Sequence, residues 1–248
     1  MDRIEAIEER ISRRSYLEEP IPLEKLAVLL DEIDQVNSES GLTVAFAEDG
    51  SDAFDAGKSY GLFSGVRSLL VFKGEKELPH LREKVGYYGE RLLLAATQLG
   101  LGSCWVGGTF DKKSPSLHTE EWEEIVCVSP VGCVRREETL KEKVVRAAIH
   151  RGTKSIAQMI RADRPLTPEE TRAMELVQRA PTARNTQKVQ FRFEGERISA
   201  WVPDDYPFDL VDLGICKYHF EAGMEGRFQW GNGGVFCPGK ERAADPEE

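Results

Sequence analysis

Two stretches of this 248-residue chain resemble one another at a constant offset of 145 residues. The offset places Pro20 on Pro165 and Phe46 on Phe191 without a gap, and in both stretches a helical pattern is followed by a strand pattern. Three further pairs are Ile21 with Leu166, Glu24 with Glu169 and Val44 with Val189. The repeat predicts an α+β chain of two tandem halves, packed on one another as the subunits of a dimer would be.

A second offset extends the similarity toward the C-terminus. At 125 residues, Gly89 falls on Gly214 and Trp105 on Trp230, across the equally long segments YGERLLLAATQLGLGSCW and LGICKYHFEAGMEGRFQW. We therefore expect a first repeat over residues 1–145 and a shorter second repeat over 146–238. Residues 239–248 include KERAADPEE, which lacks hydrophobic periodicity and is expected to be disordered.

The hydrophobic pattern predicts secondary structure along both halves. Helices are expected over 4–11, 23–33 and 80–100, strands over 42–47 and 67–74, and a pair of strands over 124–134. In the second half, Thr167 precedes Pro168 and is followed three residues later by Glu170, which is typical of a capped helix start. A strand follows at 189–193. An extended linker is expected between the first two helices.

Charge and cysteine content limit the possible partners and compartments. The formal net charge of −10 disfavours nucleic acid or an anionic membrane as the main partner, because both recruit basic surfaces. A local basic pocket for a small anion is compatible with this charge. The five cysteines show neither zinc-ligand spacing nor a disulfide framework, and the charged N-terminal stretch lacks a signal-peptide core. A cytoplasmic protein with reduced thiols is therefore expected.

The uncharged stretch 92–110 is long enough to raise the question of a membrane span. Its four glycines, together with Gln98 and Ser103, instead favour a buried helix that ends in a loop. The chain contains no dinucleotide-binding glycine fingerprint, phosphate loop or His-Glu-x-x-His zinc motif, so no metal site is predicted.

Four side chains alternate in the linker between the first two helices: Arg10, Ser12, Arg14 and Tyr16. In an extended segment they would share one face. Arg10 to Arg14 would then span about 13 Å, comparable to the distance between the phosphate of a mononucleotide and the far edge of its ring. Two guanidinium groups and a hydroxyl could bind one anion there. The alternative is a solvated basic patch.

This linker, R10-I-S12-R-R14-S-Y16 followed by P20-I21, resembles the opening of the nitroreductase-like FMN flavoproteins. Residues 180–187, APTARNTQ, are similar to that family's Ala-Pro-Ser-x-x-Asn-x-Gln signature, with Thr in place of Ser. Residues 99–110, LGLGSCWVGGTF, resemble its Leu-Gly-Leu-Gly helix end that leads to a glycine pair. The resemblance covers most of the chain and implies a nitroreductase-like α+β fold that binds FMN.

The order of these signatures departs from ordinary members of the family, in which two identical chains build each flavin site across their interface. At the 145-residue offset, residues 181–187 take the place of 36–42, where VNSESGL has lost the signature. Conversely, the positions equivalent to Arg10, Ser12 and Arg14 hold Ser155, Ala157 and Met159. The chain therefore resembles a fused branch of the family, which implies one FMN per chain and is compatible with a monomer.

The resemblance implies roles for four residues of the linker. Arg10 and Ser12 would bind the FMN phosphate, with Arg13 behind them, because guanidinium groups suit the geometry of that oxyanion. Arg14 would lie at the pyrimidine side of the flavin, where a positive charge stabilises the reduced anionic ring.

Other residues would complete the FMN site. Gly107 and Gly108 would let backbone N–H groups approach the flavin N5 and O4, although a helix C-cap is an alternative role for the pair. Lys154, with Arg151 near it, would supply a further base for the phosphate, or else belong to a solvated helix end. The residues that would cross over from the second half are Thr182, Ala183, Asn185 and Gln187; the alternative for them is a polar loop between helix and strand.

The implied activity is that of an FMN-dependent oxidoreductase that takes a hydride from NADH or NADPH and passes electrons to a small planar acceptor. The cofactor would perform the chemistry, so no catalytic side chain is predicted. Phe110, Phe228 or Trp230 could stack over the flavin, whereas His219 is expected to be a satisfied core histidine. Two alternatives come from other classes: an FMN-binding protein without turnover, for storage or sensing, and an interaction scaffold without flavin.

Overall fold

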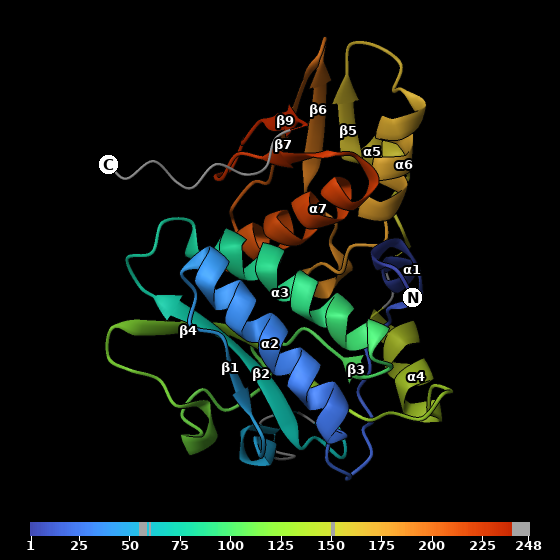
Figure 1. Ribbon diagram of the computed structural model, residues 1–248. Helices are drawn as coiled ribbons and strands as arrows, with labels where there is room; N and C mark the ends of the chain where they lie inside the picture. Colours follow the sequence, from blue (N-terminus) through green and yellow to red (C-terminus); the bar gives the residue numbers. More distant parts are fainter. Residues whose placement is uncertain (55–58, 60, 150–151, 240–248) are drawn as a thin grey trace. The chain divides into compact units, whose positions relative to one another are not determined.

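The computed structural model describes residues 1–54, 59, 61–149 and 152–239, whose helices and strands are shown in Figure 1. Arg151 and the predicted disordered tail, apart from Gly239, lie outside the described residues. The chain forms two compact units. The first comprises residues 1–81 and those from 88 to 149, and the second comprises 82–87 and those from 152 to 239. Helix α3 (Leu81–Gln98) contributes residues to both.

The first unit is built around a four-stranded antiparallel sheet in the order β1-β2-β4-β3. Its strands are β1 (Ala45–Ala47), β2 (Ser68–Glu75), β3 (Gly102–Ser103) and β4 (Glu123–Gly132). Besides part of α3, its helices are α1 (Arg3–Glu9), α2 (Leu23–Ser40), α4 (Leu140–Ile149) and the 3-10 helices η1 (Ser51–Phe54) and η2 (Pro115–Leu117). Strands β2 and β4 are buried along nearly their whole length, so they form the centre of the unit's core.

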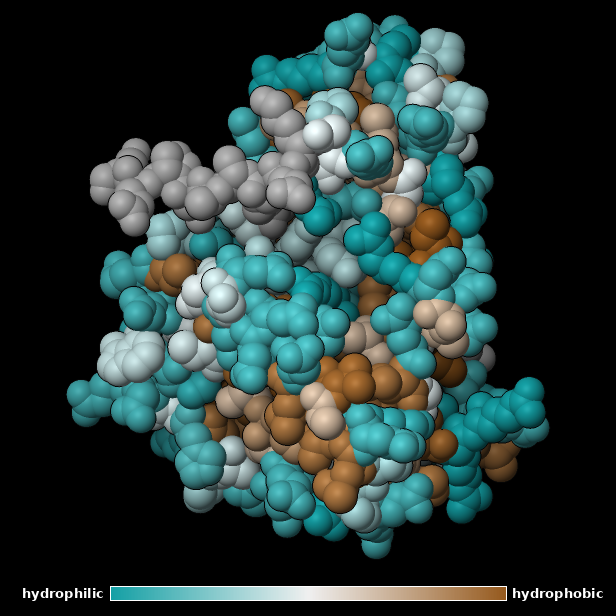
Figure 2. All heavy atoms as spheres, viewed as in Figure 1, coloured by the Kyte–Doolittle hydropathy of each residue, from teal (hydrophilic) through white to brown (hydrophobic). Residues whose placement is uncertain are grey.

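Helix α2 lies beside α3 in front of this sheet (Figure 1). Arg91 of α3 joins the two helices, because its guanidinium forms ion pairs with Glu32 and Glu39 of α2. The outer face of α2 is partly apolar: Leu23, Val28 and Leu30 are exposed, and Figure 2 shows an apolar area over the N-terminal half of the helix.

Residues 124–134, predicted to form a pair of strands, instead belong mostly to the single strand β4. A proline usually argues against a continuous central strand, because it has no backbone N–H to donate to a neighbouring strand. Here Pro130 pairs in register with Leu69 of β2, but on the other side β3 reaches only Val131 and Gly132. Because β3 is only two residues long, it does not pair with Pro130. No N–H is therefore required at that position, and β4 continues through the proline.

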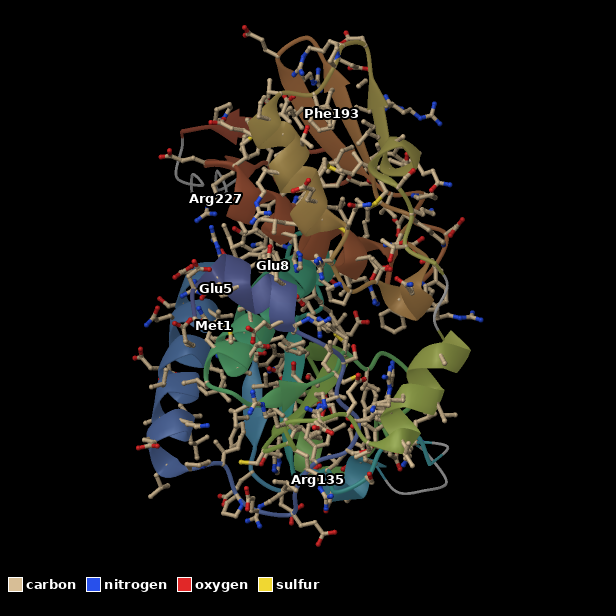
Figure 3. The ribbon with its side chains drawn as sticks, turned by 90° about the vertical axis from the view of Figure 1, so that its right-hand side faces the viewer. Met1, Glu5, Glu8, Arg135, Phe193 and Arg227 are labelled. Atoms are coloured by element: carbon tan, nitrogen blue, oxygen red, sulfur yellow. The ribbon has the colours of Figure 1, made fainter. Side chains whose placement is uncertain are left out.

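The second unit contains a three-stranded sheet in the order β5-β6-β7 and a separate hairpin, β8-β9. Its strands are β5 (Ile160–Ala162), β6 (Gln190–Glu194), β7 (Arg197–Trp201), β8 (Gly226–Phe228) and β9 (Phe236–Pro238). Its helices are α5 (Ile156–Met159), α6 (Pro168–Val177), α7 (Asp209–Gly223) and the 3-10 helix η3 (Ala183–Asn185). Phe191 stacks on Phe220 with ring centroids 5.2 Å apart, and Phe193, labelled in Figure 3, packs beside them, so aromatic rings form the core.

The predicted helix start at Thr167 is confirmed at α6. The Thr167 side chain accepts the N–H of Glu170, and the Glu170 carboxylate accepts the N–H of Thr167 at 2.8 Å. Pro168 occupies the first helical position, where its missing N–H leaves no helix bond unmade.

The first turns of α3 pack closely on α7 within the second unit. A Cβ at Gly214 would lie 2.0 Å from the carbonyl oxygen of Glu83, so only glycine permits this approach. Fully buried Lys217 pairs with the Glu83 carboxylate and also donates to the carbonyl oxygens of Gln229 (3.0 Å) and Gly231 (2.9 Å). These oxygens compensate for the loss of water around the ammonium group.

The uncharged stretch 92–110 forms the end of α3, strand β3 and the loop after it, as predicted. Helix α3 ends at Gln98, and Gly100 follows with a left-handed backbone (φ +71°). No helix within the described residues is both long enough and apolar enough to cross a membrane.

Candidate functional site

The arginine segment, residues 10–16, is extended and lies against the sheet of the first unit. Ser12 forms a parallel bridge with Ser103 of β3, and the N–H of Arg13 donates to the Ser103 carbonyl at 2.9 Å. Ser15 forms a second parallel bridge with Ser64. Two short pairings therefore fix the extended conformation that the alternating sequence predicted.

Cys104 is a common neighbour of the alternate side chains in this segment. Burial raises the pKa of the Cys104 thiol, while the positive charges of Arg14 and Arg10 and a hydrogen bond from Ser12 act in the opposite direction. Tyr16 interacts electrostatically with the same thiol. That the four side chains share one face remains a prediction from the sequence.

Two donors in this cluster are buried without a hydrogen-bond partner among the described residues: Arg10 Nη1 and Ser103 Oγ. The Nε of Arg10 lies 3.5 Å from Glu90, whose other carboxylate oxygen accepts the indole N–H of Trp105 at 2.8 Å. Glu90 therefore offsets part of the Arg10 charge but leaves Nη1 unpaired. A buried unpaired N–H is costly, and an anion bound at this cluster would supply its acceptor.

Arg13 differs from its neighbours because its guanidinium is already bound within the unit. Its Nε donates to Glu142 at 3.0 Å, and Nη1 donates to the carbonyl oxygen of Arg135, which Figure 3 labels, at 2.9 Å. Nη2 lies 3.4 Å from the carbonyl oxygen of Glu137. The structure therefore directs the donors of Arg13 into the unit, toward Glu142 and the carbonyl oxygens of residues 135 and 137.

Glu142, at the start of α4, is a buried carboxylate that remains ionised. Burial alone would raise its pKa, but hydrogen bonds from the Arg13 side chain and from the N–H groups of Arg14, Thr139 and Ser15 outweigh that effect. The pKa of Glu142 is lowered to about 2. Sequence reasoning missed this residue; the Thr139-x-x-Glu142 spacing suggests a helix cap, but nothing local indicates its contact with the arginine segment.

Gly107 and Gly108 lie in a bend that follows a bridge between Val106 and Val128. They do not cap helix α3, which ends nine residues earlier at Gln98. A Cβ at Gly108 would meet no described heavy atom within 4 Å, so the fold itself does not require glycine there. The open space is compatible with the close approach of a ligand to this backbone.

The amide loop, residues 181–187, lies in the second unit and has an unusual backbone. Arg184, Asn185 and Gln187 have φ values of 55°, 51° and 47°, in the left-handed region that non-glycine residues rarely adopt. The Thr182 hydroxyl oxygen accepts the N–H of Gln187 at 3.1 Å across the turn. Left-handed residues that persist in a defined loop indicate that surrounding contacts fix its shape.

Lys154 binds this loop directly. Its N–H donates to the Gln187 side-chain oxygen and its Nζ donates to the Gln187 carbonyl oxygen, both at 2.8 Å. Gln178, the C-cap residue that follows α6, donates in turn to the Lys154 carbonyl oxygen at 2.8 Å. The structure therefore brings Lys154 together with Gln187, which is itself buried, and directs the ammonium to a protein oxygen.

Asp212 of α7 is a second site residue that sequence reasoning missed. Its carboxyl oxygens accept the N–H of Ala183 at 2.9 and 3.0 Å. Burial raises the pKa of Asp212 to about 8; the Ala183 N–H and Lys188 act against the shift, and the Asp209 carboxylate adds to it. The loop is thus bound by a group that is largely uncharged near neutral pH.

Two of the three aromatic residues considered for flavin stacking belong to cores. Phe110 packs in the apolar cluster of the first unit, and Phe228 is 1% exposed. Trp230 is half-buried, edge-on to Tyr87 at 5.6 Å. His219 is fully buried with Nδ1 3.0 Å from the Leu176 carbonyl oxygen, as expected for a satisfied core histidine.

The predicted site residues are thus divided between the two units. The first unit holds Arg10, Ser12, Arg13, Arg14, Gly107 and Gly108, and the second holds Lys154, Thr182, Ala183, Asn185 and Gln187. That the two groups share one ligand remains a prediction from the sequence.

Comparisons with known proteins agree with the fold. The model of a family described as "Putative TM nitroreductase" matches residues 2–224. A solved structure described as a "putative nitroreductase" of Thermotoga maritima MSB8 is similar over 96% of this chain and 93% of its own, with 21% identity and a TM-score of 0.62. This likeness confirms the nitroreductase-like α+β fold.

Shorter matches include a nitroreductase with bound FMN from Bacteroides fragilis NCTC 9343, with 18% identity and a TM-score of 0.42 over 56% of this chain and 95% of its own. Another is an FMN-dependent nitroreductase from Clostridium difficile R20291, with 18% identity and a TM-score of 0.43 over 58% of this chain and 96% of its own. Among curated proteins, none matches this chain.

Proposed function

Because this chain belongs to the "Putative TM nitroreductase" family, we propose that it is an FMN-dependent oxidoreductase that uses NADH or NADPH to reduce a small planar acceptor. The proposal includes one FMN per chain, contacted by the arginine segment of the first unit and the amide loop of the second. We also propose that the chain is monomeric and is located in the cytoplasm. The five cysteines, all free thiols, are compatible with a reducing compartment.

The observation that carries the proposal is the cationic cluster around Cys104. Arg10 and Arg14 lie there with the Ser12 hydroxyl, and Arg10 Nη1 and Ser103 Oγ are buried donors without an acceptor among the described residues. Donors of this kind fit a phosphate, whose oxygens accept several charge-assisted hydrogen bonds at once. The residues present therefore suit the phosphate end of FMN.

We assign the remaining residues by what each can do for a bound flavin. Among the described residues, the hydrogen bond of the Arg14 guanidinium is a 3.5 Å contact from Nη1 to the Ser12 carbonyl oxygen, which leaves its charge available to the pyrimidine edge. Backbone N–H groups at Gly107 and Gly108 can approach the ring, and Asn185 can both donate and accept toward a uracil-like edge. When bound, FMN supplies hydride and electron transfer at N5. The protein orients the reactants and limits access of water.

The element boundaries support a duplicated chain. Helix α2 begins at Leu23 and α6 at Pro168, and β1 begins at Ala45 and β6 at Gln190, so both pairs preserve the offset of 145. Helices α3 and α7 end at Gln98 and Gly223, which preserves the offset of 125. We therefore propose repeats over 1–145 and 146–238, arranged as an intramolecular pseudo-dimer.

An absorption spectrum of the purified chain, followed by release and counting of FMN, tests the proposal. We expect close to one FMN per chain and bleaching of the flavin by NADH or NADPH without oxygen. Two FMN per chain would contradict the divided site. Yellow protein that neither donor reduces would indicate binding without turnover, and protein that stays colourless after incubation with FMN would indicate a scaffold. Light scattering of the eluting protein checks whether it is a monomer.

A further inference from the structure

Glu142 connects helix α4 to the arginine segment through both of its carboxylate oxygens. Oε1 accepts the N–H groups of Arg14 at 2.8 Å and Ser15 at 3.1 Å, in addition to the Arg13 Nε at 3.0 Å. Oε2 accepts the N–H of Thr139 at 2.8 Å and its hydroxyl at 3.0 Å. One side chain that is 1% exposed thus joins two backbone segments that are distant in sequence.

The contacts on Oε1 act on the residues that the proposed function requires. The N–H of Arg14 belongs to the peptide group that joins Arg13 to Arg14. Ser12, with its hydroxyl, lies before this peptide group, and the Arg14 guanidinium follows it. Fixing two successive N–H groups restricts the backbone torsions between them, so it restricts the directions of these side chains as well. Glu142 itself is oriented by Thr139 and Arg13, and both of its carboxylate oxygens already accept hydrogen bonds within the first unit.

We infer that Glu142 is a positioning residue for phosphate binding: it fixes the backbone that presents Ser12 and Arg14 to the ligand, without contacting the ligand. The inference rests on the proposed function, because it assumes that the arginine segment binds the FMN phosphate. It assigns Arg13 to the same task, since the Arg13 guanidinium orients Glu142 by contacts with both carboxylate oxygens.

A glutamine at this position would keep the volume of the side chain and break the connection. Its amide has a single acceptor oxygen, so it can serve either the Oε1 contacts or the Oε2 contacts but not both. The NH₂ group would face donors wherever it pointed. The Arg13 guanidinium would also lose its counter-charge.

The chain contains a matched control in the second unit. Glu170 follows Thr167 by three residues, as Glu142 follows Thr139, and in both pairs the threonine N–H donates at 2.8 Å and the threonine hydroxyl accepts at 3.2 Å. Glu170 is also buried and pairs with an arginine, Arg164. Its hydrogen bonds go to Arg164 and Thr167, not to a residue of the proposed FMN site. Glu170→Gln therefore reproduces the loss of a buried ion pair beside a capping box, since the glutamine oxygen can still accept the Thr167 N–H.

The test compares FMN with riboflavin, which lacks the phosphate, as titrants of the full-length apoprotein. We expect Glu142→Gln to raise the Kd for FMN about tenfold or more and to raise the Kd for riboflavin by a much smaller factor, because riboflavin meets Arg14 at its pyrimidine edge but lacks the phosphate. Glu170→Gln should leave both dissociation constants unchanged. Thermal unfolding of each apoprotein shows whether the two variants are comparably stable.

Equal losses for FMN and riboflavin, or equal losses in Glu142→Gln and Glu170→Gln, would overturn the inference, because either result indicates a general structural effect. Wild-type binding of FMN with no change in Glu142→Gln would overturn the inference and leave the proposed function standing. Failure of the wild-type protein to bind FMN would overturn both. If Glu142→Gln does not fold, Thr139→Val, with Thr167→Val as its control, removes one donor to the Glu142 carboxylate and gives the same comparison in milder form.

Discussion

Each unit of this protein fixes a candidate ligand-binding segment with a buried carboxyl group, yet the two groups differ in charge. Glu142 binds the arginine segment and has its pKa lowered to about 2, whereas Asp212 binds the amide loop and has its pKa raised to about 8. Both are nearly inaccessible to water. Burial pushes both pKa values upward, so burial does not explain the difference.

The number of donors and the nearest charges explain it. Glu142 receives an arginine side chain and three backbone N–H groups, which together stabilise the anion. Asp212 receives one backbone N–H and lies near a second carboxylate, Asp209, while Lys188 exerts only a smaller opposing effect. The comparison shows that the same task, accepting backbone N–H groups of a loop, can be performed by a charged or by an uncharged carboxyl group.

The largest expected effect comes from deleting the charged member of the pair. Glu142→Ala should lower the free energy of unfolding by about 3–5 kcal/mol, because it leaves the buried Arg13 guanidinium without its counter-charge. Asp212→Ala should cost about 1–3 kcal/mol, since it leaves one N–H unpaired. Urea unfolding at pH 7 measures both. Equal losses in the two variants would show that the charge difference has no energetic consequence.

Next in size is the effect of pH on Asp212. The pKa of Asp212 is higher in the folded chain than in the unfolded chain. Between about pH 4 and 8 the folded chain therefore binds more protons than the unfolded chain, and the free energy of unfolding falls as the pH rises. From pH 6 to 8, this group should lower the free energy of unfolding by about 2 kcal/mol. Asp212→Asn, whose amide oxygen can still accept the Ala183 N–H, should remove that slope. An unchanged slope in the variant would contradict an uncharged Asp212.

The pH effect on Glu142 should have the opposite sign and a lower window. Because the pKa of Glu142 is lowered on folding, the stabilisation it provides is complete above about pH 5 and is lost as pH falls toward 2. Between pH 4.5 and 3.5 the loss should be at most about 1 kcal/mol. Unfolding of Glu142→Gln over this range should show a shallower dependence than the wild-type protein; a dependence as steep as that of the wild type would contradict the assignment.

The smallest effect on stability is expected at Gly108. A Cβ there meets nothing within 4 Å among the described residues, so Gly108→Ala should change the free energy of unfolding by less than about 0.5 kcal/mol. If the proposed flavin lies against this backbone, the same variant should weaken FMN binding. Full FMN affinity in Gly108→Ala would show that the ligand does not contact Gly108. The comparison of the two segments would then rest on their carboxyl groups alone.

Features that depend on neighbouring residues could be predicted from the sequence. The Thr167 cap follows from side chains that reach their own backbone, and the extended conformation of Arg10 to Tyr16 follows from their two-residue alternation. The continuous strand β4 was missed because Pro130 is tolerated only through the shortness of β3, a property of another segment.

The residues that bind the two segments could not be predicted for the same reason. Glu142 meets Arg14 across 128 positions, and Asp212 meets Ala183 across 29. Lys154 has the charge expected of a phosphate base, but its ammonium donates to the Gln187 carbonyl oxygen, 33 residues away. Residue type gives the chemistry that a side chain can perform, whereas its partner depends on which segments the fold brings together.

The two oxygens of Glu142 also make the first turn of α4 and the extended arginine segment cooperative. Unfolding either one releases the carboxylate on which the other depends, so the two should open together in a single local fluctuation. A ligand that reduces local opening of the arginine segment would then slow amide hydrogen exchange in the first turn of α4. The beginning of that helix, far along the chain, would report whether the segment is occupied.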